Sequence, residues 1–424
     1  MVRTSLARLV LVLSSALSIV AASPTPDTPQ KRWLNFGYGL GQKVRGVDLG
    51  GWFVLEPYIN LSLFRQFESS GNIPVDEYHF TQYLGQAEAL AQLQTHWDTW
   101  ITQDDFTQMA AAGLNHVRIP IGYWAFQLGA GDPYVQGQIP YLERALGWAR
   151  AANIKVWIDL HGAPGSQNGF DNSGLRDSYN WQTDYNLALT NSVLDQIIAT
   201  YSAFEWNDVI VAIQPVNEPL GTIMNMDLVR QYYQYAYSTL RGNSDIVLAI
   251  HDAFQSPPAW NGFMTYPDYT HVILDTHQYQ VFSAGELSRD VDTHIAVACG
   301  VGAMIAEVEL WTVVGEWSAA LTDCAEWLNG VNRGARYDGS YDSSPFYGSC
   351  ETRWDFSTWS DTDKMNSRRY VEAQLDAYEH NSQGWIFWCW KTENAIEWDF
   401  KALLANGIMP SPLTDRQYPG QCGY

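Results

Sequence analysis

Short apolar runs that alternate with amphipathic stretches are the feature that most constrains the fold of this chain. Eight runs are rich in β-branched residues and have the length of buried strands. Eight strands separated by helices predict one α/β domain, a parallel (β/α)₈ or TIM barrel with long strand-to-helix loops. The predicted strands are residues 44–49, 116–121, 155–160, 209–216, 246–250, 272–275, 312–315 and 385–390, and the clearest predicted helices are 141–152, 193–202, 228–241 and 368–380.

A doubly wound open sheet is the structural alternative. Such sheets usually carry a glycine-rich phosphate-binding loop, and this sequence has none. No internal repeat and no linker rich in proline, glycine or serine divides the chain, so a single domain is predicted. The segments after the third and sixth predicted strands, residues 162–183 and 278–290, are long enough to form a substrate pocket.

The N-terminal residues are typical of a targeting segment. A basic start, an apolar stretch too short to span a bilayer and small residues up to Ala22 predict a signal peptide over residues 1–22. Residues 23–32 end in Lys31-Arg32 and are predicted to be a pro-peptide, which leaves residues 33–424 as the catalytic domain. We therefore expect a secreted protein, extracellular or in the cell wall.

Charge and motifs exclude several classes of function. Loss of residues 1–32 removes four basic residues and one acidic residue, which changes the formal net charge from −22 to −25. Such a chain is not expected to bind nucleic acid or anionic membranes. The nine histidines show no metal-ligand spacing, and no Gly-x-Ser-x-Gly, His-Glu-x-x-His, Cys-x-x-Cys or Walker motif is present. We predict no metal and no cofactor, and we expect a monomer.

Two glutamates follow apolar, β-branched runs and are the candidate catalytic groups. Glu218 lies in Asn217-Glu218-Pro219 after the fourth predicted strand, and Glu316 lies in Gly315-Glu316-Trp317 at the end of the seventh. The carboxyl ends of parallel barrel strands meet at one mouth, where such folds place their chemistry. Two carboxylates that face one cavity are what cleavage of a glycosidic bond requires.

Other polar and aromatic residues end predicted strands on the same face. Arg118 is surrounded by apolar residues and must be paired, and we predict that it contacts the nucleophilic carboxylate and lowers its pKa. Asn217 offers an uncharged donor for a sugar hydroxyl. Trp388 and Trp390 alternate along the eighth predicted strand, so both are expected to point the same way. The remaining candidates of this kind are His161, His277 and Tyr279.

Five cysteines in a secreted chain leave one without a partner. Cys389 lies in an apolar run and is predicted to be a buried thiol. Cys299, Cys324, Cys350 and Cys422 would then form two disulfides, for which three pairings are possible. Asn60-Leu61-Ser62 is the one sequon for N-glycosylation, and it predicts a surface position for Asn60.

These residues occur in strings that resemble the fungal exo-β-1,3-glucanases of glycoside hydrolase family 5 (clan A), over about residues 34–424. The strings are Arg45-Gly46-Val47, Gly50-Gly51-Trp52, Leu55-Glu56-Pro57, His116-Val117-Arg118-Ile119-Pro120, residues 159–169, Asn217-Glu218-Pro219, His277-Gln278-Tyr279, Gly315-Glu316-Trp317-Ser318 and residues 388–394.

The resemblance implies roles for individual residues. It makes Glu218 the acid/base and Glu316 the nucleophile, and it pairs Cys299 with Cys422 and Cys324 with Cys350. It also implies that Phe170 and Phe282 form an aromatic pair at the pocket entrance. The full set predicted to bind substrate is Glu56, Arg118, His161, Asn217, His277, Tyr279, Trp388, Phe170, Phe282, Asp171 and Asn172.

The predicted activity is therefore that of a secreted, retaining exo-β-1,3-glucanase. It would release glucose from the non-reducing ends of β-1,3-glucan polysaccharides or oligosaccharides, and would also transfer glucose during remodelling of wall glucan. A hydrolase of β-1,6- or β-1,4-glucan on the same fold is one alternative. A non-catalytic glucan-binding wall protein is another, and the presence of both glutamates argues against it.

Overall fold

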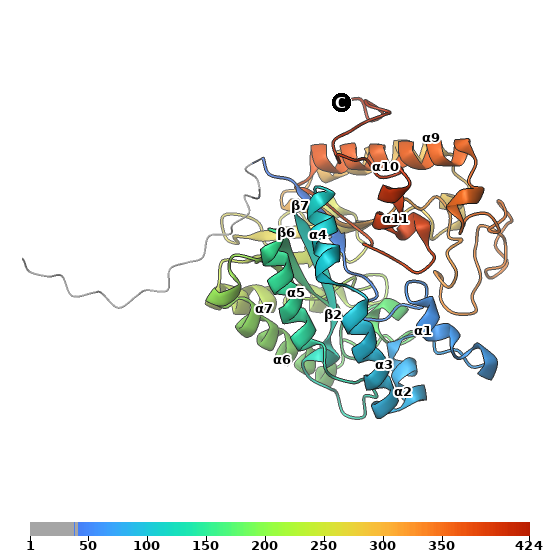
Figure 1. Cartoon of the computed structure of the whole chain (residues 1–424). Helices are drawn as coiled ribbons and strands as arrows, with labels where there is room; N and C mark the ends of the chain where they lie inside the picture. The colour runs from blue at the N-terminus through green and yellow to red at the C-terminus, as the bar shows by residue number, and fades with distance from the viewer. Residues whose placement is uncertain (1–37, 39–40) are drawn as a thin grey trace, which may run out of the picture. The chain divides into compact units, whose positions relative to one another are not determined.

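The computed structural model describes Tyr38 and residues 41–424, and the predicted signal peptide and pro-peptide lie outside these residues. Eight parallel strands form a closed barrel in sequence order, so the predicted (β/α)₈ fold is confirmed (Figure 1). The strands are β1 Val44–Asp48, β2 His116–Gly122, β3 Lys155–Gly162, β4 Ile210–Gln214, β5 Val247–His251, β6 Val272–Gln278, β7 Trp311–Trp317 and β8 Gly384–Phe387.

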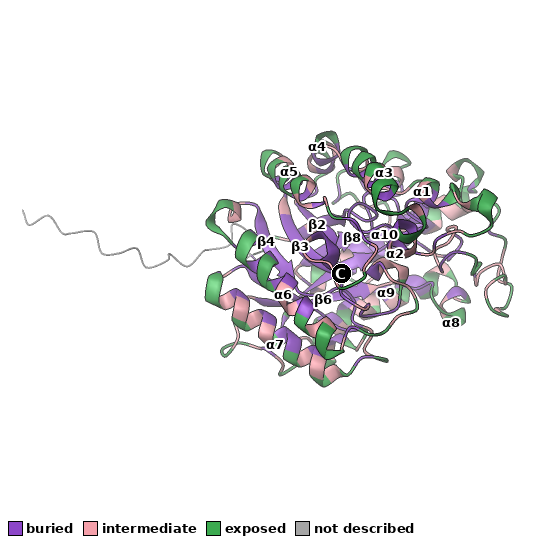
Figure 2. Ribbon diagram, turned by 90° about the horizontal axis from the view of Figure 1, so that it is seen from below, coloured by how far each residue is buried: buried purple, intermediate pink, exposed green. Residues whose placement is uncertain are grey.

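Helices connect the strands and cover the barrel. Figure 2 shows the strands as buried at the centre, whereas the helices around them expose their outer faces, as expected for a parallel sheet that is covered by helices. Among the described residues, no helix is both long and apolar enough to cross a membrane. The helices are α1 Leu61–Arg65, α2 Glu77–Leu84, α3 Gln86–Thr99, α4 Gln103–Ala111, α5 Ile139–Ala151, α6 Asp184–Tyr201, α7 Met226–Asn243, α8 Ala284–Leu287, α9 Val291–Ile305, α10 Asp361–Asn381 and α11 Phe400–Ala405.

Helices α6 and α10 begin several residues before their predicted starts. The side chain of Thr183 accepts a hydrogen bond from the backbone N–H of Asn186 at the start of α6, and Ser360 forms a capping box with Asp363 at the start of α10. These caps satisfy N–H groups that have no partner within a helix. The first turns are polar, so apolar spacing alone did not reveal them.

The ends of the strands also differ from the prediction. Strand β4 ends at Gln214, so Glu218 lies in the following loop, whereas β7 continues to Trp317 and contains Glu316. Strand β8 ends at Phe387, so the predicted alternation of Trp388 and Trp390 on this strand is wrong. The two indole N–H groups donate in different regions. Trp388 donates to the Tyr58 hydroxyl at the barrel mouth, whereas Trp390 donates to Asp105 of α4, among the covering helices.

Glycine is required where β7 passes β6. A Cβ atom added to Gly315 would collide with the carboxylate of Asp275, which points into the barrel from β6. The absence of a side chain lets the two strands pair in a register that sets His277 beside Glu316. Because Gly315 has no side chain, the buried carboxylate of Asp275 can lie against the strand residue that precedes Glu316.

Both disulfides have the pairing that the resemblance implied. Cys299 of α9 is bonded to Cys422, and Cys324 is bonded to Cys350 within the long loop between β7 and α10. Cys389 is a free thiol and is fully buried, as predicted.

Asn60 does not have the surface position that its sequon predicted. The residue is 0 % exposed, and its side-chain oxygen accepts a hydrogen bond from the backbone N–H of Glu56. The folded barrel has no room there for a glycan, which corrects the prediction of glycosylation at this site.

We therefore expect Asn60 to be unmodified in the mature protein, because the buried side chain cannot carry a sugar in the native fold. Peptide mapping by mass spectrometry before and after treatment with an N-glycosidase would test this. A peptide containing Asn60 that appears only after the treatment would contradict it.

Candidate active site

A cavity of about 540 Å³ lies at the C-terminal ends of the strands, within the usual size range for ligand sites. Most residues predicted to bind substrate line it, whereas Arg118, His161 and Asn217 lie fully buried behind its floor. The predicted residues that line the cavity are Glu56, Phe170, Asp171, Asn172, Glu218, His277, Tyr279, Phe282, Glu316 and Trp388.

Glu316 is held by three donors. Arg118 Nη1 lies 2.8 Å from Oε1, and the Tyr279 hydroxyl donates to Oε2 at 2.8 Å. Nδ1 of His277 lies 3.3 Å from the same Oε2. These contacts fix the carboxylate at the cavity floor, where a nucleophile would have to lie.

Glu218 has a left-handed backbone conformation, with φ of 46°, which is uncommon for a residue other than glycine. Its Oε1 lies 2.7 Å from Nδ1 of His277, and Asn172 Nδ2 donates to Oε2 at 2.9 Å. The preceding residue, Asn217, is held by the backbone oxygen of Leu160, which accepts its N–H. The neighbouring hydrogen bonds hold the loop in a conformation that aims the carboxyl group into the cavity.

The two glutamates share one histidine nitrogen, which limits their separation. Oε1 of Glu218 and Oε2 of Glu316 lie 2.7 and 3.3 Å from His277 Nδ1, so they can be no more than about 6 Å apart. Retaining glycosidases hold their carboxyl groups about 5–5.5 Å apart, and inverting ones about 6.5–9.5 Å. The observed limit favours the retaining arrangement.

Arg118 is the centre of a buried network beneath the cavity. Its predicted contact with Glu316 is confirmed, and the guanidinium donates to partners on three further strands and to Asn217. A fully buried charge is stable only when it is paired in this way. The other partners are Asp48 of β1, Asp159 of β3 and Gln214 of β4, at 2.8, 3.0 and 2.8 Å.

The pKa values of the two glutamates are shifted in opposite directions. Burial raises the pKa of Glu316 above its usual value, and it outweighs the opposing effects of His277 and Arg118. Arg118 lowers the pKa of Glu316, as predicted. The prediction that the pKa as a whole lies below its usual value is wrong, because burial has the larger effect. Burial also raises the pKa of Glu218, but the hydrogen bond and charge of His277 bring it down to about 2.

The pKa of His277 is raised by its carboxylate neighbours. Burial lowers its pKa, but the charges of Glu316 and Asp275 raise it well above the usual value. Both ring nitrogens contact carboxylates, since Nε2 lies 3.1 Å from Asp275 and Nδ1 contacts Glu218. The raised pKa favours the imidazolium form, whose charge would offset part of the negative charge of the two glutamates.

Several buried polar atoms in the described residues have no hydrogen-bond partner, and four of them belong to residues that line the cavity. They are Glu56 Oε1, Asp171 Oδ2, Arg176 Nη1 and Trp398 Nε1. Buried polar groups without partners are costly, so these atoms are suited to the hydroxyl groups of a ligand. The ring of Trp388, which also lines the cavity, is stacked parallel to His161 at 5.4 Å and supplies an apolar face for a sugar ring.

Several cavity residues were not found from the sequence. Phe254 is 40 % exposed and lies close to Phe170, so the entrance has three phenylalanines rather than the predicted two. Its position three residues after β5 was the available signal. The others are Tyr58, Gly169, Arg176, Leu220, Glu286, Trp398 and, from the loop between β7 and α10, Leu328, Asn329, Gly330, Arg333, Arg336 and Tyr341.

Glu218, His251 and His277 are the one group in the described part of the chain whose ligand atoms are close enough to hold a metal ion, within 4.8 Å of one another. The hydrogen bonds oppose that role. Both nitrogens of His277 contact carboxylates, and Nδ1 of His251 accepts the N–H of Ala253. A metal would have to displace protons that these contacts retain.

Known proteins resemble the chain over nearly its whole length. It is 53% identical to a glucan 1,3-β-glucosidase of Yarrowia lipolytica, over 99% of this chain and 100% of that protein. It is 54% identical to glucan 1,3-β-glucosidase 2 of Wickerhamomyces anomalus, over 97% and 98%, and 51% identical to glucan 1,3-β-glucosidase I/II of Saccharomyces cerevisiae, over 97% of each.

A solved structure shares the fold of the chain, and a family model matches more than half of its sequence. The rutinosidase of Aspergillus niger has the same fold, with a TM-score of 0.68 and 20% identity over 87% of this chain and 98% of that one. Residues 81–333 match the model of the cellulase family, glycosyl hydrolase family 5. The chain therefore belongs to glycosyl hydrolase family 5.

Proposed function

We propose that this protein is a retaining exo-β-1,3-glucanase that releases glucose from the non-reducing ends of β-1,3-glucan. The observation that carries the proposal is the pair of buried carboxyl groups that contact the same nitrogen of His277, at a cavity floor where Glu56 Oε1 has no partner. This floor suits one sugar ring between a nucleophile and an acid. About 50% identity to glucan 1,3-β-glucosidases over the full length supports the linkage.

In the first step, Glu316 would attack the anomeric carbon and form a glycosyl-enzyme. Arg118 and Tyr279 hold its oxygens in place for the attack. The bond to the leaving oxygen breaks as Glu218 gives that oxygen a proton. We infer that this proton comes from the 2.7 Å hydrogen bond with His277, because its transfer from Nδ1 to Oε1 leaves a neutral imidazole and a protonated acid.

In the second step, Glu218 would act as a base and take a proton from water. The water oxygen attacks the anomeric carbon, the bond to Glu316 breaks, and glucose leaves with its original configuration. The same cavity could accept a sugar hydroxyl in place of water. Transfer of glucose to a glucan, and thus remodelling of wall polymers, is part of the proposal.

Exo action would follow from a cavity that is closed on one side. Glu56 and Trp388 are buried lining residues, whereas three lining phenylalanines are about 40 % exposed, as expected for an entrance. The product profile on laminarin tests this, since we expect glucose from the first minutes rather than a ladder of oligomers. Cellulose and pustulan are the controls, and faster release of sugar from either would favour the β-1,4- or β-1,6-linked alternative.

We expect β-glucose as the first anomer when laminarin hydrolysis is followed by proton NMR before mutarotation. The reason is the separation of about 6 Å or less between the glutamate oxygens, which leaves no room for a water between carboxyl and sugar. Initial release of α-glucose would mean inversion, and the role of Glu316 as nucleophile would have to be abandoned.

We further propose that the protein is secreted and acts as a monomer outside the cell or in its wall. The predicted signal peptide supports secretion, and so do two disulfides, which persist in oxidising compartments.

A further inference from the structure

The long loop between β7 and α10, residues 318–360, supplies one side of the cavity. Six of its residues line the cavity, and we call them the wall: Leu328, Asn329, Gly330, Arg333, Arg336 and Tyr341. The loop contains little regular structure, with one short 3₁₀ turn at Phe356–Thr358. Something other than a helix or strand must therefore hold the wall in place.

The wall faces the half of the cavity that would receive the leaving group. Arg333 forms an ion pair of 2.9 Å with Asp177, in the loop after β3, and a side chain at Gly330 would approach Arg176 of the same loop. That loop also carries Asn172, which donates to Glu218. Since Glu218 would protonate the leaving oxygen, the wall lies beside the sugars that follow the cleaved bond.

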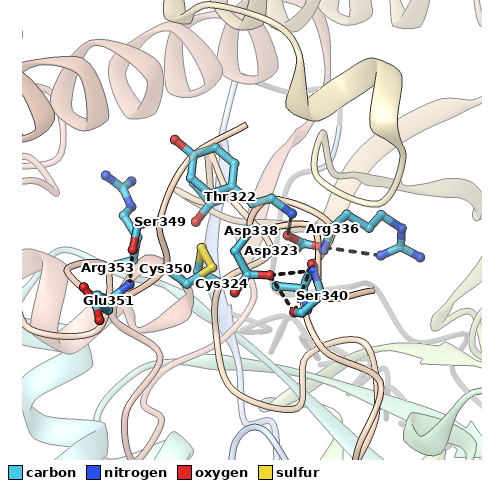
Figure 3. Close-up of a disulfide and its surroundings, with 12 residues drawn as sticks. Thr322, Asp323, Cys324, Arg336, Asp338, Ser340, Ser349, Cys350, Glu351 and Arg353 are labelled. Atoms are coloured by element: carbon cyan, nitrogen blue, oxygen red, sulfur yellow. Dashed lines mark hydrogen bonds and ion pairs between the residues drawn. A yellow bond between two sulfur atoms is a disulfide. The ribbon is translucent and has the colours of Figure 1, made fainter. Parts of the chain in front are cut away.

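Asp323 is the buried anchor of the wall. Its side chain is fully buried, and Oδ2 accepts from Asn329 Nδ2 at 2.9 Å and from the backbone N–H of Arg336 at 2.8 Å. Oδ1 accepts the backbone N–H of Tyr337 at 2.9 Å. Figure 3 shows Asp323 joined to Arg336 beside the disulfide between Cys324 and Cys350. One carboxylate thus holds two wall residues, Asn329 and Arg336, and the backbone of Tyr337 that follows them.

Two residues next to the wall in sequence have a positive φ. Trp327 and Asn332 have φ values of 62° and 64°, in the left-handed region that residues other than glycine rarely adopt. Conformations of this kind persist only when surrounding contacts impose them. Charge-assisted hydrogen bonds to a buried carboxylate are among the strongest contacts available.

We propose that Asp323 is a positioning residue that holds the wall against the leaving-group half of the cavity and thereby sets the affinity for the second and later sugars of a glucan. Asp323 does not itself line the cavity, so it would act only through the wall. The inference rests on the proposed function, because it assumes a substrate longer than one sugar.

Asp323→Asn tests the proposal with little change of shape. Either orientation of the new amide places its NH₂ group against a backbone N–H, of Arg336 or of Tyr337, and one anchor is lost. We expect the KM for laminaritriose to rise about tenfold, which matches the loss of one such hydrogen bond. The kcat for laminaritriose should change less than about twofold, and so should the hydrolysis of an aryl β-glucoside, which has one sugar and offers the wall no second or later glucose to bind.

Asp338→Asn is the matched control, since Asp338 lies in the same loop but is partly exposed and accepts only from Ser340. It should leave both substrates unaffected. Equal losses on laminaritriose and the aryl glucoside, or an unchanged KM, would overturn the proposal. If thermal unfolding shows that Asp323→Asn does not fold, Asp323→Glu decides instead, because it keeps the charge but shifts the carboxylate by one methylene. An unchanged KM in that variant also overturns the proposal.

The wild-type protein separates this inference from the proposed function. Failure of the wild type to cleave laminaritriose would refute the function, whatever the variants do. Cleavage by the wild type, together with a KM that does not respond to Asp323, would refute only the role of the wall anchor.

Discussion

Replacement of Glu316 with Gln is expected to lower kcat on laminarin and on aryl β-glucosides by on the order of 10⁴-fold or more, because no covalent intermediate can form without the carboxylate. The fold should persist. The amide oxygen of the new side chain can still accept from Arg118, which keeps its ion pairs with Asp48 and Asp159.

Two measurements make this result specific. The thermal unfolding midpoint (Tm) of Glu316→Gln should be close to that of the wild type, and the variant should still bind laminaritriose measurably. Glu307→Gln, which changes an exposed glutamate after α9, is the matched control and should keep full activity. Activity of the Glu316→Gln variant above a few per cent of the wild-type value would exclude Glu316 as the nucleophile.

The second large effect is expected for Glu218→Ala and should depend on the leaving group. A general acid contributes about 10²- to 10⁴-fold, and only substrates with poor leaving groups need the proton. Laminarin hydrolysis should therefore fall by that amount, whereas cleavage of an activated aryl glucoside should fall far less. Removal of the carboxyl group also opens space beside His277 for a small anion.

Azide provides the test of orientation. Added azide should partly restore turnover of the aryl glucoside by the Glu218→Ala variant and yield a β-glucosyl azide, because azide would attack the glycosyl-enzyme from the face that Glu218 serves. An α-azide, or equal losses on both substrates, would contradict the assignment of Glu218 as the acid/base.

The barrel could be predicted because its strands are buried on both faces and therefore read as continuous apolar runs. Arg118 was predicted to be paired for a similarly simple reason, since a buried charge needs a partner. Strand β6 was predicted too short because Thr276, His277 and Gln278 are polar, although they still pair with β7. Their polarity reflects the cavity that they face.

The sequence was less informative where contacts between distant loops determine the structure. His277 was predicted to line the pocket, but its position between both glutamates depends on the register of β6 and β7. The wall has no periodic pattern, because its shape comes from Asp323 and a disulfide rather than from helix or strand geometry. Phe254 follows strand β5, whose end was predicted one residue too early, and no pocket residues were predicted in the loop after this strand.

The network around Arg118 also bears on how this enzyme can diverge. One guanidinium joins side chains from β1, β3, β4 and β7, so a change at any of these positions disturbs all the others and needs several simultaneous substitutions to compensate. Residues 318–360 have no such interlocking with the barrel floor. New specificities can therefore arise one substitution at a time in that loop, while the reacting groups below it are inherited unchanged.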